Sequence, residues 1–512
     1  MVVLGASELM GTATPAVHSR ASRPFLELRA FLDHLEASGR LHRVCKPVDK
    51  DWELACIARW ALECTAEVDA YAILFEKIRN HTQSVVVNLY PNAESYAAAL
   101  GTTSDALLQC WSTAMQCPLK PVLVGSAPAQ QVLHKDSDVN LLALPAPVWT
   151  PGLDAGPYLS AASVITKDPE TGVQNVGIYR MQIHDATHAG LAFASKSQHG
   201  AIHLEKYAKL GEPMPIAAIV GAPPAVTFAS AAKVVYGFDE LGIAGALSGT
   251  PLEVVRASTV DLLVPAWAEL VIEGYVRPEA SRTEGPFGEV LGYLSDAAPA
   301  AVVEVTAITH RCQPVHCGFV QQLPPSDGHL VMELGALGPL WFYLTRKFGL
   351  QGIRNMAIAR GSAAFSVLIV QIDDRQTVDI CRAAQAIARF GLGQKFIYFV
   401  DQDVDIRDTE TINWVLSTRV DPQRDIHFID NVRTFQSDPS TMARAAEQEK
   451  EPGTPPYDSS IAVVNATLRC AAPKVCLPEA ALMKRTRSEW EQTGLPALNT
   501  RKRLERLLDI YR

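Results

Sequence analysis

The sequence predicts an α+β protein with several domains, and three observations carry that prediction. Its 512 residues exceed the length at which a single hydrophobic core stops growing. Between Ser160 and Arg311, many short β-rich runs are separated by turn signals, which is typical of a barrel-like β domain. From Gly328 onward, helical and strand patterns alternate, which is typical of an α/β domain.

The N-terminal part of the chain predicts a tail followed by a small α/β module. Residues 1–23 are rich in Ala, Ser, Thr and Gly and contain one acid, so we expect a disordered tail, with an organellar presequence as the alternative. Residues 24–120 are expected to form the module. Apolar residues recur at helical spacing before Gly39 and over residues 51–64, residues 70–90 alternate like one or two strands, and residues 91–117 are helical again.

The middle of the chain, residues 121–318, predicts the β domain. Residues 160–196 contain three β-rich runs separated by the turn signals KDPETG and HDATHAG, as expected for an antiparallel meander. A helix is expected from His199, and later strands in LEVVRAS, LLVPAWAELVIEGYVRP and AVVEVTAITHR. A segment with two glutamates joins the last two strands.

Residues 319–475 predict a second α/β domain, and residues 476–512 a charged helical tail. The apolar runs FSVLIVQI and KFIYFV do not alternate, which indicates strands that are buried on both faces of a parallel sheet. Residues 437–460 are polar and contain proline, so we expect a long surface loop there.

Composition argues against two classes of protein. Hydrophobic residues make up 48% of the chain and charged residues 20%, and no apolar run is long enough to span a membrane, so we expect no transmembrane helix. The formal net charge of -9 argues against binding nucleic acid through bulk electrostatics. The ten cysteines show neither a CxxC pair nor zinc-like spacing, so we expect reduced thiols in an intracellular protein.

The segment SRTEGPFGEVLGY, residues 281–293, is the first candidate for chemistry. It places Glu284 and Glu289 on either side of Gly285, Pro286 and Gly288, which prevents a regular helix or an uninterrupted central strand. A loop that turns back brings two acids toward one point, whereas a five-residue spacing on a straight strand sends them to opposite faces. Two carboxyl groups held close together suit proton transfer. The alternative is a turn with two solvated glutamates.

A set of polar residues in apolar β-rich surroundings is the second candidate. These are Asn175 and Arg180 in QNVGIYRMQ, Gln198 and His199 in SKSQHGAIH, and Glu240 in YGFDELGIAGALSG. Asn175 and Arg180 would face opposite ways on a flat strand, so we expect a bulge at Gly177 or a strand that starts after Asn175. The chain has no glycine-rich dinucleotide loop, no phosphate-binding GxxxxGK[ST] and no GxSxG elbow.

Asn175, His199 and Glu240 together offer oxygen and nitrogen donors that suit manganese or magnesium. Each also has a structural alternative. Asn175 can cap the preceding turn, His199 can cap the following helix, and Glu240 can be a helix-start acid that the helix dipole favours. His184 and His188 flank the hairpin tip HDATH, and we expect them to be exposed turn residues rather than metal ligands.

Four segments carry a resemblance to a known family. NVGIYRMQ, SQHGAIH, DELGIAGALSG and EGPFGEVLGY occur in the same order and at similar spacing as the hallmark segments of UbiD-like decarboxylases, and KFIYFVDQDVDIRDTETINWVLSTR resembles that family too. The resemblance implies that residues 121–318 form a split β-barrel flavin-binding domain and residues 319–475 an α/β oligomerisation domain. It implies a homo-oligomer, either a dimer or a hexamer. The implied cofactor is prenylated FMN, whose phosphate is held through manganese and commonly potassium.

Carried over residue by residue, the resemblance implies a metal site, a flavin site and a catalytic network. The implied metal ligands are Asn175, His199 and Glu240. The implied flavin-binding residues are these three together with Ile178, Tyr179, Arg180 and Gln198. In the implied catalytic network, Arg180 orients the substrate carboxylate or pairs with Glu284, and Glu289 delivers a proton.

The resemblance also points to residues around the phosphate and the substrate. Either Arg389 or Lys395 is expected to support the flavin phosphate. Gly328, His329, Met332 and residues after Ser459 are expected to line the substrate pocket.

The function implied is the non-oxidative, reversible decarboxylation of an aromatic, heteroaromatic or α,β-unsaturated carboxylic acid. The segments DAGPYLS and YGFDELGIAGAL resemble those of the bacterial aromatic-acid members more than those of the cinnamate enzymes, which favours an aromatic acid. A flavin prenyltransferase is expected to supply the cofactor, and the expected location is cytoplasmic. The alternatives are a flavin-dependent oxidoreductase with a split β-barrel and a non-catalytic flavin carrier.

Overall fold

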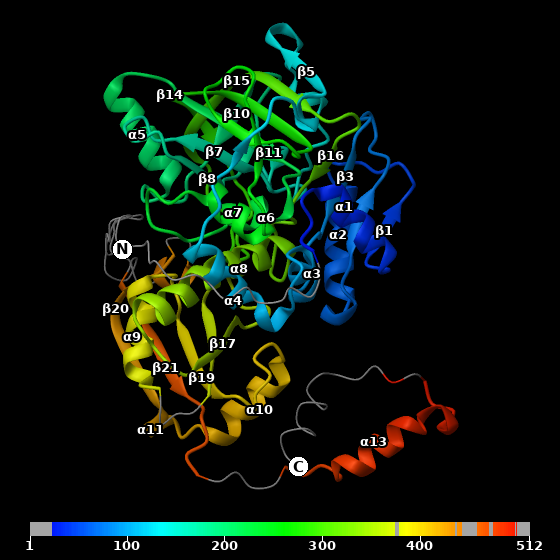
Figure 1. Ribbon diagram of the computed structural model, residues 1–512, viewed down its shortest axis with the longest axis vertical. Helices are drawn as coiled ribbons and strands as arrows, with labels where there is room; N and C mark the ends of the chain where they lie inside the picture. The colour runs from blue at the N-terminus through cyan, green and yellow to red at the C-terminus, as the bar shows by residue number, and fades with distance from the viewer. Residues whose placement is uncertain are drawn as a thin grey trace. The chain divides into compact units, whose positions relative to one another are not determined.

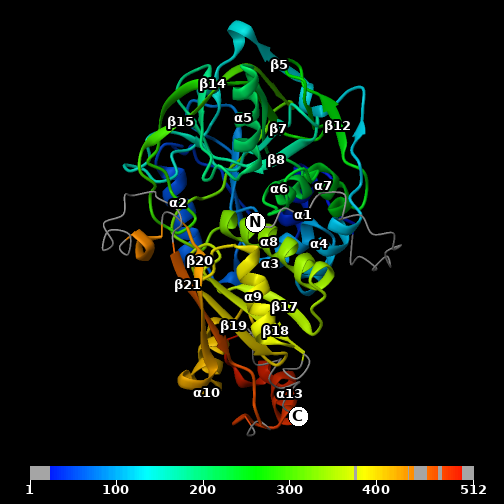
Figure 2. The ribbon, with the colours of Figure 1, turned by 90° about the vertical axis from the view of Figure 1, so that its left-hand side faces the viewer.

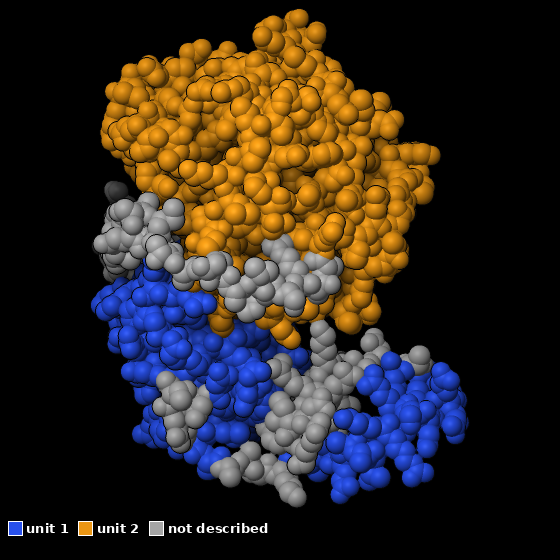
Figure 3. Space-filling view, in the orientation of Figure 1, with its two compact units in different colours: residues 1, 343–512 blue, residues 2–342 orange. Residues whose placement is uncertain are grey.

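The computed structural model describes residues 23–373, 378–435, 438–442, 458–470, 475–496 and 498. The chain divides into two compact units, one of residues 2–342 and the other of residue 1 with residues 343–512 (Figure 3). The tail predicted over residues 1–23 lies outside the described residues except for its last position, as does most of the loop predicted over residues 437–460. The domain boundaries at residues 120, 318 and 475 remain predictions. Among the described residues, no helix is long and apolar enough to cross a membrane.

The first unit begins with a four-stranded sheet of order β1-β2-β3-β16, accompanied by helices (Figure 1). Helix α1 forms because Leu28, Phe31, Leu32 and Leu35 recur at helical spacing, and all four are buried. The order of helices and strands agrees with the sequence prediction. The elements are α1 (Leu28–Ala37), β1 (Leu41–Val44), α2 (Glu53–Cys64), β2 (Ala72–Phe75), β3 (Ser84–Val87), α3 (Ala93–Ala99), α4 (Leu107–Gln116) and β16 (Val315–Cys317).

A curled, wholly antiparallel sheet of nine strands forms the rest of this unit's β structure. Its order is β6-β9-β10-β15-β14-β11-β7-β8, with β5 paired to β15, and this half-barrel makes the fold a mixed α+β one. The strands are β5 (Val132–Lys135), β6 (Tyr158–Leu159), β7 (Ser163–Lys167), β8 (Gln174–Ile178), β9 (Met181–Ile183), β10 (His188–Leu191), β11 (Met214–Val220), β14 (Leu270–Glu284) and β15 (Ala298–His310). Every residue of β11 is buried, which explains its unbroken apolar sequence.

Helices cover this sheet at two places (Figures 1 and 2). Helix α5 packs against β7 and β14, while α6 and α7 pack against β8. The remaining elements of the unit are α5 (His199–Leu210), α6 (Pro224–Ser230), α7 (Glu240–Ser248), α8 (Asp327–Phe342) and the small sheet of β4 (Val122–Leu123), β12 (Glu253–Arg256) and β13 (Leu263–Pro265). Short 3-10 turns occur at Glu67–Asp69, Ser104–Ala106, Pro128–Gln130, Asp136–Asp138 and Leu141–Ala143.

The local structure around Asn175 and Arg180 corrects the sequence prediction. A bulge at Gly177 or a strand starting after Asn175 was expected, but β8 starts before Asn175 and pairs with β7 in continuous register from Gln174 to Ile178. The strand ends at Ile178 instead, and the chain passes through Tyr179 and Arg180 into β9, which pairs with other strands. That two-residue break releases Arg180 from the face alternation of β8.

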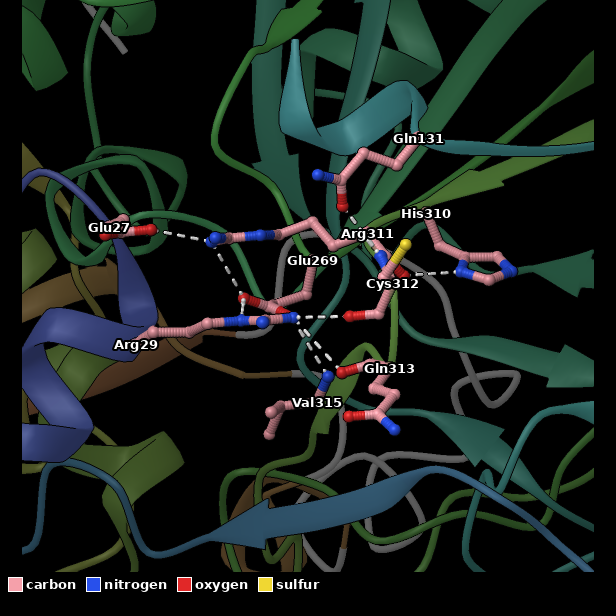
Figure 4. A network of polar contacts seen from close by, with 9 residues as sticks. All are labelled: Glu27, Arg29, Gln131, Glu269, His310, Arg311, Cys312, Gln313 and Val315. Carbon is pink, nitrogen blue, oxygen red and sulfur yellow. Dashed lines mark hydrogen bonds and ion pairs between the residues drawn. The ribbon is translucent and has the colours of Figure 1, made fainter.

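A buried carboxylate, Glu269, ties helix α1 to the curled sheet (Figure 4). Arg29 of α1 donates from Nε to Oε1 and from Nη2 to Oε2, both at 2.8 Å. Arg311 donates to Oε1 of Glu269 at 3.3 Å and to Glu27 at 2.7 Å, and the Val315 N–H donates to Oε2 at 3.1 Å. These bonds offset the cost of burying the charge and fix the N-terminal module to the β domain.

The second unit contains a mixed five-stranded sheet of order β17-β18-β19-β21-β20. Strands β18, β19 and β21 run parallel, as predicted for FSVLIVQI and KFIYFV, and β17 and β20 are antiparallel edges. The elements are a π-helical turn (Tyr343–Lys347), β17 (Ile353–Ile358), β18 (Val367–Ile372), α9 (Ile380–Phe390), β19 (Phe396–Asp401), α10 (Thr409–Arg419), α11 (Pro422–Asp425), β20 (Ile426–Arg433), β21 (Asp458–Asn465), α13 (Ala480–Ser488) and a 3-10 turn (Trp490–Thr493).

Candidate active site

Arg180 binds both glutamates of the segment singled out in the sequence. Its Nε donates to Glu284 Oε1 at 2.8 Å and its Nη2 to Glu284 Oε2 at 2.7 Å, while Nη1 donates to Glu289 Oε1. Nη2 also donates to Ser295 Oγ at 3.3 Å. The Glu284 side chain is 2% exposed, whereas Arg180 and Glu289 are 19% and 22% exposed. The alternative of a turn with two solvated glutamates therefore does not hold.

The backbone explains how two acids five positions apart reach one guanidinium. Glu284 is the last residue of β14, and Gly285 follows with φ +85°, a conformation that favours glycine. Farther along, the Glu289 N–H donates to the Tyr293 carbonyl at 2.7 Å, and the Gly292 N–H donates to the Glu289 carbonyl at 2.9 Å. Glu284 is thus held by the strand and Glu289 by a tight loop that turns back toward it.

Charge is concentrated around the guanidinium. Burial alone would lower the pKa of Arg180, but the Glu284 and Glu289 carboxylates outweigh that effect and hold its pKa above the ordinary value. Burial, followed by the nearby Glu284 charge, raises the pKa of Tyr158, whose hydroxyl accepts from the Gly285 N–H at 3.1 Å. One cation facing two carboxyl groups can orient a carboxylate and leave one acid available for proton transfer.

A second cluster forms where two helices begin. His199 is the first residue of α5 and Glu240 the first residue of α7. His199 Nδ1 lies 3.1 Å from Asn175 Oδ1 and 3.4 Å from Glu240 Oε1. Asn175 Nδ2 faces the Tyr179 hydroxyl at 3.4 Å, and this contact turns its amide oxygen toward His199. The predicted set of Asn175, His199 and Glu240 is therefore brought together.

The structural alternatives for these three residues have different outcomes. Asn175 lies inside β8 and does not cap a turn. The N-cap residue of α5 is Gln198, so His199 does not cap that helix. Glu240 does lie at a helix start, as expected for an acid favoured by the dipole.

The side chains of the second cluster are of types that could hold a divalent cation. Glu240 is 2% exposed, and burial raises its pKa although His199 and the Val176 N–H oppose the rise, so a cation would complete its charge balance. Amide oxygen, imidazole nitrogen and carboxylate oxygen suit manganese or magnesium. Among the described residues, no three His, Cys, Asp or Glu side chains form a metal site, so a three-donor site at this cluster would need the amide oxygen of Asn175.

Two further features indicate what kind of ligand this place suits. The N-termini of α5 and α7 meet at the cluster, and helix N-termini favour anions such as phosphate. Gln198 Oε1 is buried and has no hydrogen-bond partner among the described residues. An unpaired buried acceptor beside two helix starts suits a ligand that carries hydrogen-bond donors.

The residues predicted beside the flavin and at the substrate pocket lie around β8 and in α8. The Tyr179 ring packs against Gly177, where a Cβ would lie 2.5 Å from it. The Tyr179 hydroxyl accepts from the Gly200 N–H and also contacts the Asn175 amide, so this side chain helps to hold Asn175. Ile178 is half-buried at the end of β8. Gly328, His329 and Met332 lie in the first turns of α8.

The residues predicted near the phosphate lie in the second unit. Arg389 lies in the last turn of α9. Lys395 Nζ donates to Asp438 Oδ1 at 2.8 Å and to Ser440 Oγ at 2.7 Å. Which of the two supports a phosphate stays a prediction.

His184 and His188 correct one expectation. Both are half-buried rather than exposed, and His188 Nδ1 lies 2.9 Å from Asp185 Oδ1. A turn that packs against neighbouring strands covers side chains that the hairpin sequence alone would expose.

The structure adds two residues to the site that the sequence analysis did not predict there, Ser295 and Tyr158. Ser295 Oγ accepts from Arg180 and also from the Phe287 N–H, and the Tyr158 hydroxyl accepts from the Gly285 N–H. Tyr158 is 127 positions away from Gly285. No local pattern marks such a contact, since it depends on the curl of the sheet.

Comparison with known proteins gives consistent findings along the chain. Three family models match, described as the N-terminal, Rift-related and C-terminal domains of 3-octaprenyl-4-hydroxybenzoate carboxy-lyase, UbiD, over residues 32–115, 121–323 and 333–450. An uncharacterised protein in the cooM 5' region of Rhodospirillum rubrum is 32% identical over 423 residues, covering 81% of this chain and 88% of that protein.

Solved structures agree with this result. The UbiD-class enzyme HmfF from Pelotomaculum thermopropionicum in complex with FMN is 32% identical, with a TM-score of 0.77 over 88% of this chain and 97% of that one. An evolved dimeric form of the same enzyme has been solved with prFMN. Vanillic acid decarboxylase from Sedimentibacter hydroxybenzoicus is 27% identical, with a TM-score of 0.78 over 92% of this chain and 100% of that one.

Proposed function

Because the chain belongs to the UbiD family of carboxy-lyases, we propose that it decarboxylates an aromatic, heteroaromatic or α,β-unsaturated carboxylic acid, non-oxidatively and reversibly, with prenylated FMN. The observation that carries the proposal is the pairing of Arg180 with both Glu284 and Glu289. Asn175 lies in β8, and Arg180 lies in the break that follows this strand. The chain therefore places the Arg180 network close in sequence to the Asn175 cluster. Within this class an aromatic acid is favoured, because the segment DAGPYLS resembles that of the bacterial aromatic-acid members of the family.

The proposed cofactor is prenylated FMN, with its phosphate bound through manganese and potassium. Solved structures of HmfF are complexes with FMN and, for the evolved dimeric form, with prFMN. In this chain Asn175, His199 and Glu240 would hold the manganese, and the α5 and α7 N-termini would face the phosphate. Ile178, Tyr179, Arg180 and Gln198 would lie beside the flavin. When bound, the prenylated flavin supplies an electron sink for the electron pair left by departing carbon dioxide.

The residues of this chain account for the remaining steps. The Arg180 guanidinium orients the substrate carboxylate, and the two bonds that it donates to Glu284 keep the guanidinium plane fixed. After carbon dioxide leaves, Glu289 delivers a proton from its carboxyl group to the carbon that carried the carboxylate. In the reverse direction Glu289 takes that proton back. Positions fixed in advance lower the cost of ordering these groups during the reaction.

The decisive test is an assay of the cofactor-loaded protein. The chain is co-expressed with a flavin prenyltransferase, and bound flavin and metal are identified by mass spectrometry and elemental analysis. Loss of carbon dioxide is then measured on a panel that includes vanillic acid, 3,4-dihydroxybenzoic acid and cinnamic acid. Carbon dioxide release from at least one acid is expected. Substrate-dependent bleaching of oxidised flavin without carbon dioxide would indicate an oxidoreductase, and flavin binding without turnover would indicate a carrier.

We also propose a homo-oligomer, either a dimer or a hexamer, in the cytoplasm. A dimeric form of HmfF and a vanillic acid decarboxylase with a second subunit support an assembly. All ten cysteines are free thiols, which is consistent with a reducing compartment. Light scattering of the purified chain measures the oligomer directly.

A further inference from the structure

The loop that carries Glu289 rests on residues 321–329 at three points. Gly288 lies so close that a Cβ there would be 2.2 Å from the Gln321 carbonyl oxygen, and a Cβ on Gly292 would be 2.8 Å from Pro324 Cδ. The third point is a hydrogen bond of 3.1 Å between His329 Nε2 and the carbonyl oxygen of Val290. Val290 directly follows Glu289, so this bond holds the peptide unit between Val290 and Leu291, one residue beyond the acid.

The partners of the imidazole define its tautomer. A carbonyl oxygen can only accept, so His329 Nε2 carries the hydrogen in the bond to Val290. Nδ1 lies 2.6 Å from Ser326 Oγ, and in the neutral ring Nδ1 accepts from that hydroxyl. The ring is 4% exposed, and burial lowers its pKa to about 4, which keeps it neutral near pH 7.

The start of α8, which carries His329, is itself held in place by hydrogen bonds. Asp327, two residues before His329, is fully buried. Its carboxyl group accepts from the Leu89 N–H at 3.0 Å and from the Gly328 N–H at 2.9 Å. The first turn of α8 is thereby tied to the N-terminal module. A side chain on a fixed element can hold a neighbouring loop in place.

We propose that His329 is a positioning residue: its Nε2–H holds the Val290 carbonyl and so keeps the Glu289 carboxyl at the Arg180 guanidinium. This role differs from the substrate-lining role implied by the family resemblance, because Val290 and Ser326 occupy both ring nitrogens. The inference rests on the proposed function for the role of Glu289, since a misplacement of about 1 Å at a catalytic group can cost 100-fold in rate. The loop anchor itself does not depend on that function.

Three variants of the full-length chain separate positioning from folding. In His329→Leu both hydrogen bonds are lost, whereas in His329→Gln the amide N–H can still donate to Val290 and its oxygen can accept from Ser326. Ser326→Ala removes the hydroxyl that selects the tautomer, together with its longer contact of 3.4 Å to the His329 N–H. The first readout is amide hydrogen exchange across residues 286–295 in the protein without substrate. The second is kcat and KM for decarboxylation by the cofactor-loaded protein on the panel acid that turns over.

His329→Leu is expected to speed exchange in this loop about 10-fold or more, with unchanged exchange in α5, and to lower kcat far more than it changes KM. His329→Gln is expected to restore both readouts to within a few-fold of the original protein. If His329→Leu does not fold, Ser326→Ala should show the same changes at smaller size.

Unchanged loop exchange in His329→Leu, or in Ser326→Ala where the leucine variant does not fold, would overturn the proposal. Failure of His329→Gln to restore the loop would overturn it as well. Faster exchange in a protein that decarboxylates no panel acid would support the anchor and count against the proposed function, so the two failures are distinguishable.

Discussion

Arg180 and Glu284 are 104 positions apart and form a doubly hydrogen-bonded ion pair, with Nε–Oε1 at 2.8 Å and Nη2–Oε2 at 2.7 Å. The Glu284 side chain is 2% exposed, so removal of the Arg180 charge would leave a buried carboxylate poorly compensated. The same guanidinium also binds Glu289, so the position of this proposed proton donor depends on Arg180 as well.

Arg180→Lys is expected to lower kcat/KM about 100-fold and to destabilise the first unit by about 2 kcal/mol. An ammonium group is a point charge and cannot make the two parallel bonds to Glu284 while reaching Glu289. Steady-state kinetics and urea unfolding measure the two effects. Arg282→Lys is the control, because Arg282 lies on β14 close to Glu284, is 43% exposed and pairs with Asp185. Equal losses in both variants would contradict the assignment.

Glu289→Gln is expected to retain flavin and metal but to lose at least about 100-fold in kcat, since glutamine cannot deliver a proton. Its amide still accepts from Arg180, so the loop keeps its shape. Flavin absorption confirms cofactor retention, and carbon dioxide release measures turnover. Glu279→Gln, an exposed glutamate on β14, should behave like the original protein. A fully active Glu289→Gln would exclude Glu289 as the proton donor.

Local patterns predicted most of the elements because their causes are local. Helix α1 follows from apolar residues at helical spacing, and β11 from an unbroken apolar run that both faces of the sheet can bury. Gly285, Pro286 and Gly288 predicted an irregular loop after Glu284, and the structure has it there. Even so, the pairing of that loop with Arg180 came from the family resemblance rather than from spacing.

What the sequence could not supply depends on tertiary contacts. The end of β8 at Ile178 is set by the strands that β9 joins, not by Gly177. His329 carries no local sign that its ring would hold Val290, because that bond forms only when α8 lies under the loop. Half-burial of His184 likewise follows from packing, which a hairpin sequence does not reveal.

His199→Ala is expected to weaken manganese binding at least about 10-fold and to reduce the amount of flavin that copurifies. The imidazole lies between Asn175 and Glu240, and its loss leaves two oxygen donors. Metal content and calorimetric titration measure the change. His188→Ala, which removes a half-buried imidazole on the hairpin, is the control. Unchanged metal content in His199→Ala would place the cation elsewhere.

Arg29→Met is expected to destabilise the protein by about 2 kcal/mol, because Glu269 is fully buried and loses two of its bonds. Arg311 and the Val315 N–H still contact that carboxylate, which limits the loss. Glu269→Gln together with Arg29→Met removes the buried charge that has lost most of its compensation, and should recover part of the stability. Urea unfolding of both variants tests this, and a double variant no more stable than Arg29→Met would contradict the charge argument.

His316 predicts a loss of stability in acid. Its ring is 2% exposed, neither ring nitrogen has a hydrogen-bond partner among the described residues, and burial lowers its pKa from 6.5 to about 3, with His81 and Lys50 adding to the effect. Because the unfolded chain takes up this proton near pH 6.5 and the folded chain does not, the contribution of neutral His316 is fully present above about pH 6.5. It is lost as the pH falls toward 3, at up to about 1.4 kcal/mol per pH unit.

His316→Leu should therefore make stability less dependent on pH between 7 and 5. The variant removes this one titration and leaves His203 and His329, whose pKa values burial lowers to about 4, so the pH dependence becomes shallower without vanishing. Urea unfolding at pH 7, 6 and 5 compares the slopes, with His188→Leu as the control. The original protein should lose about 2 kcal/mol more than His316→Leu over this range, since 1.5 pH units lie between 6.5 and 5. Parallel slopes would show that His316 gains a proton in the folded protein.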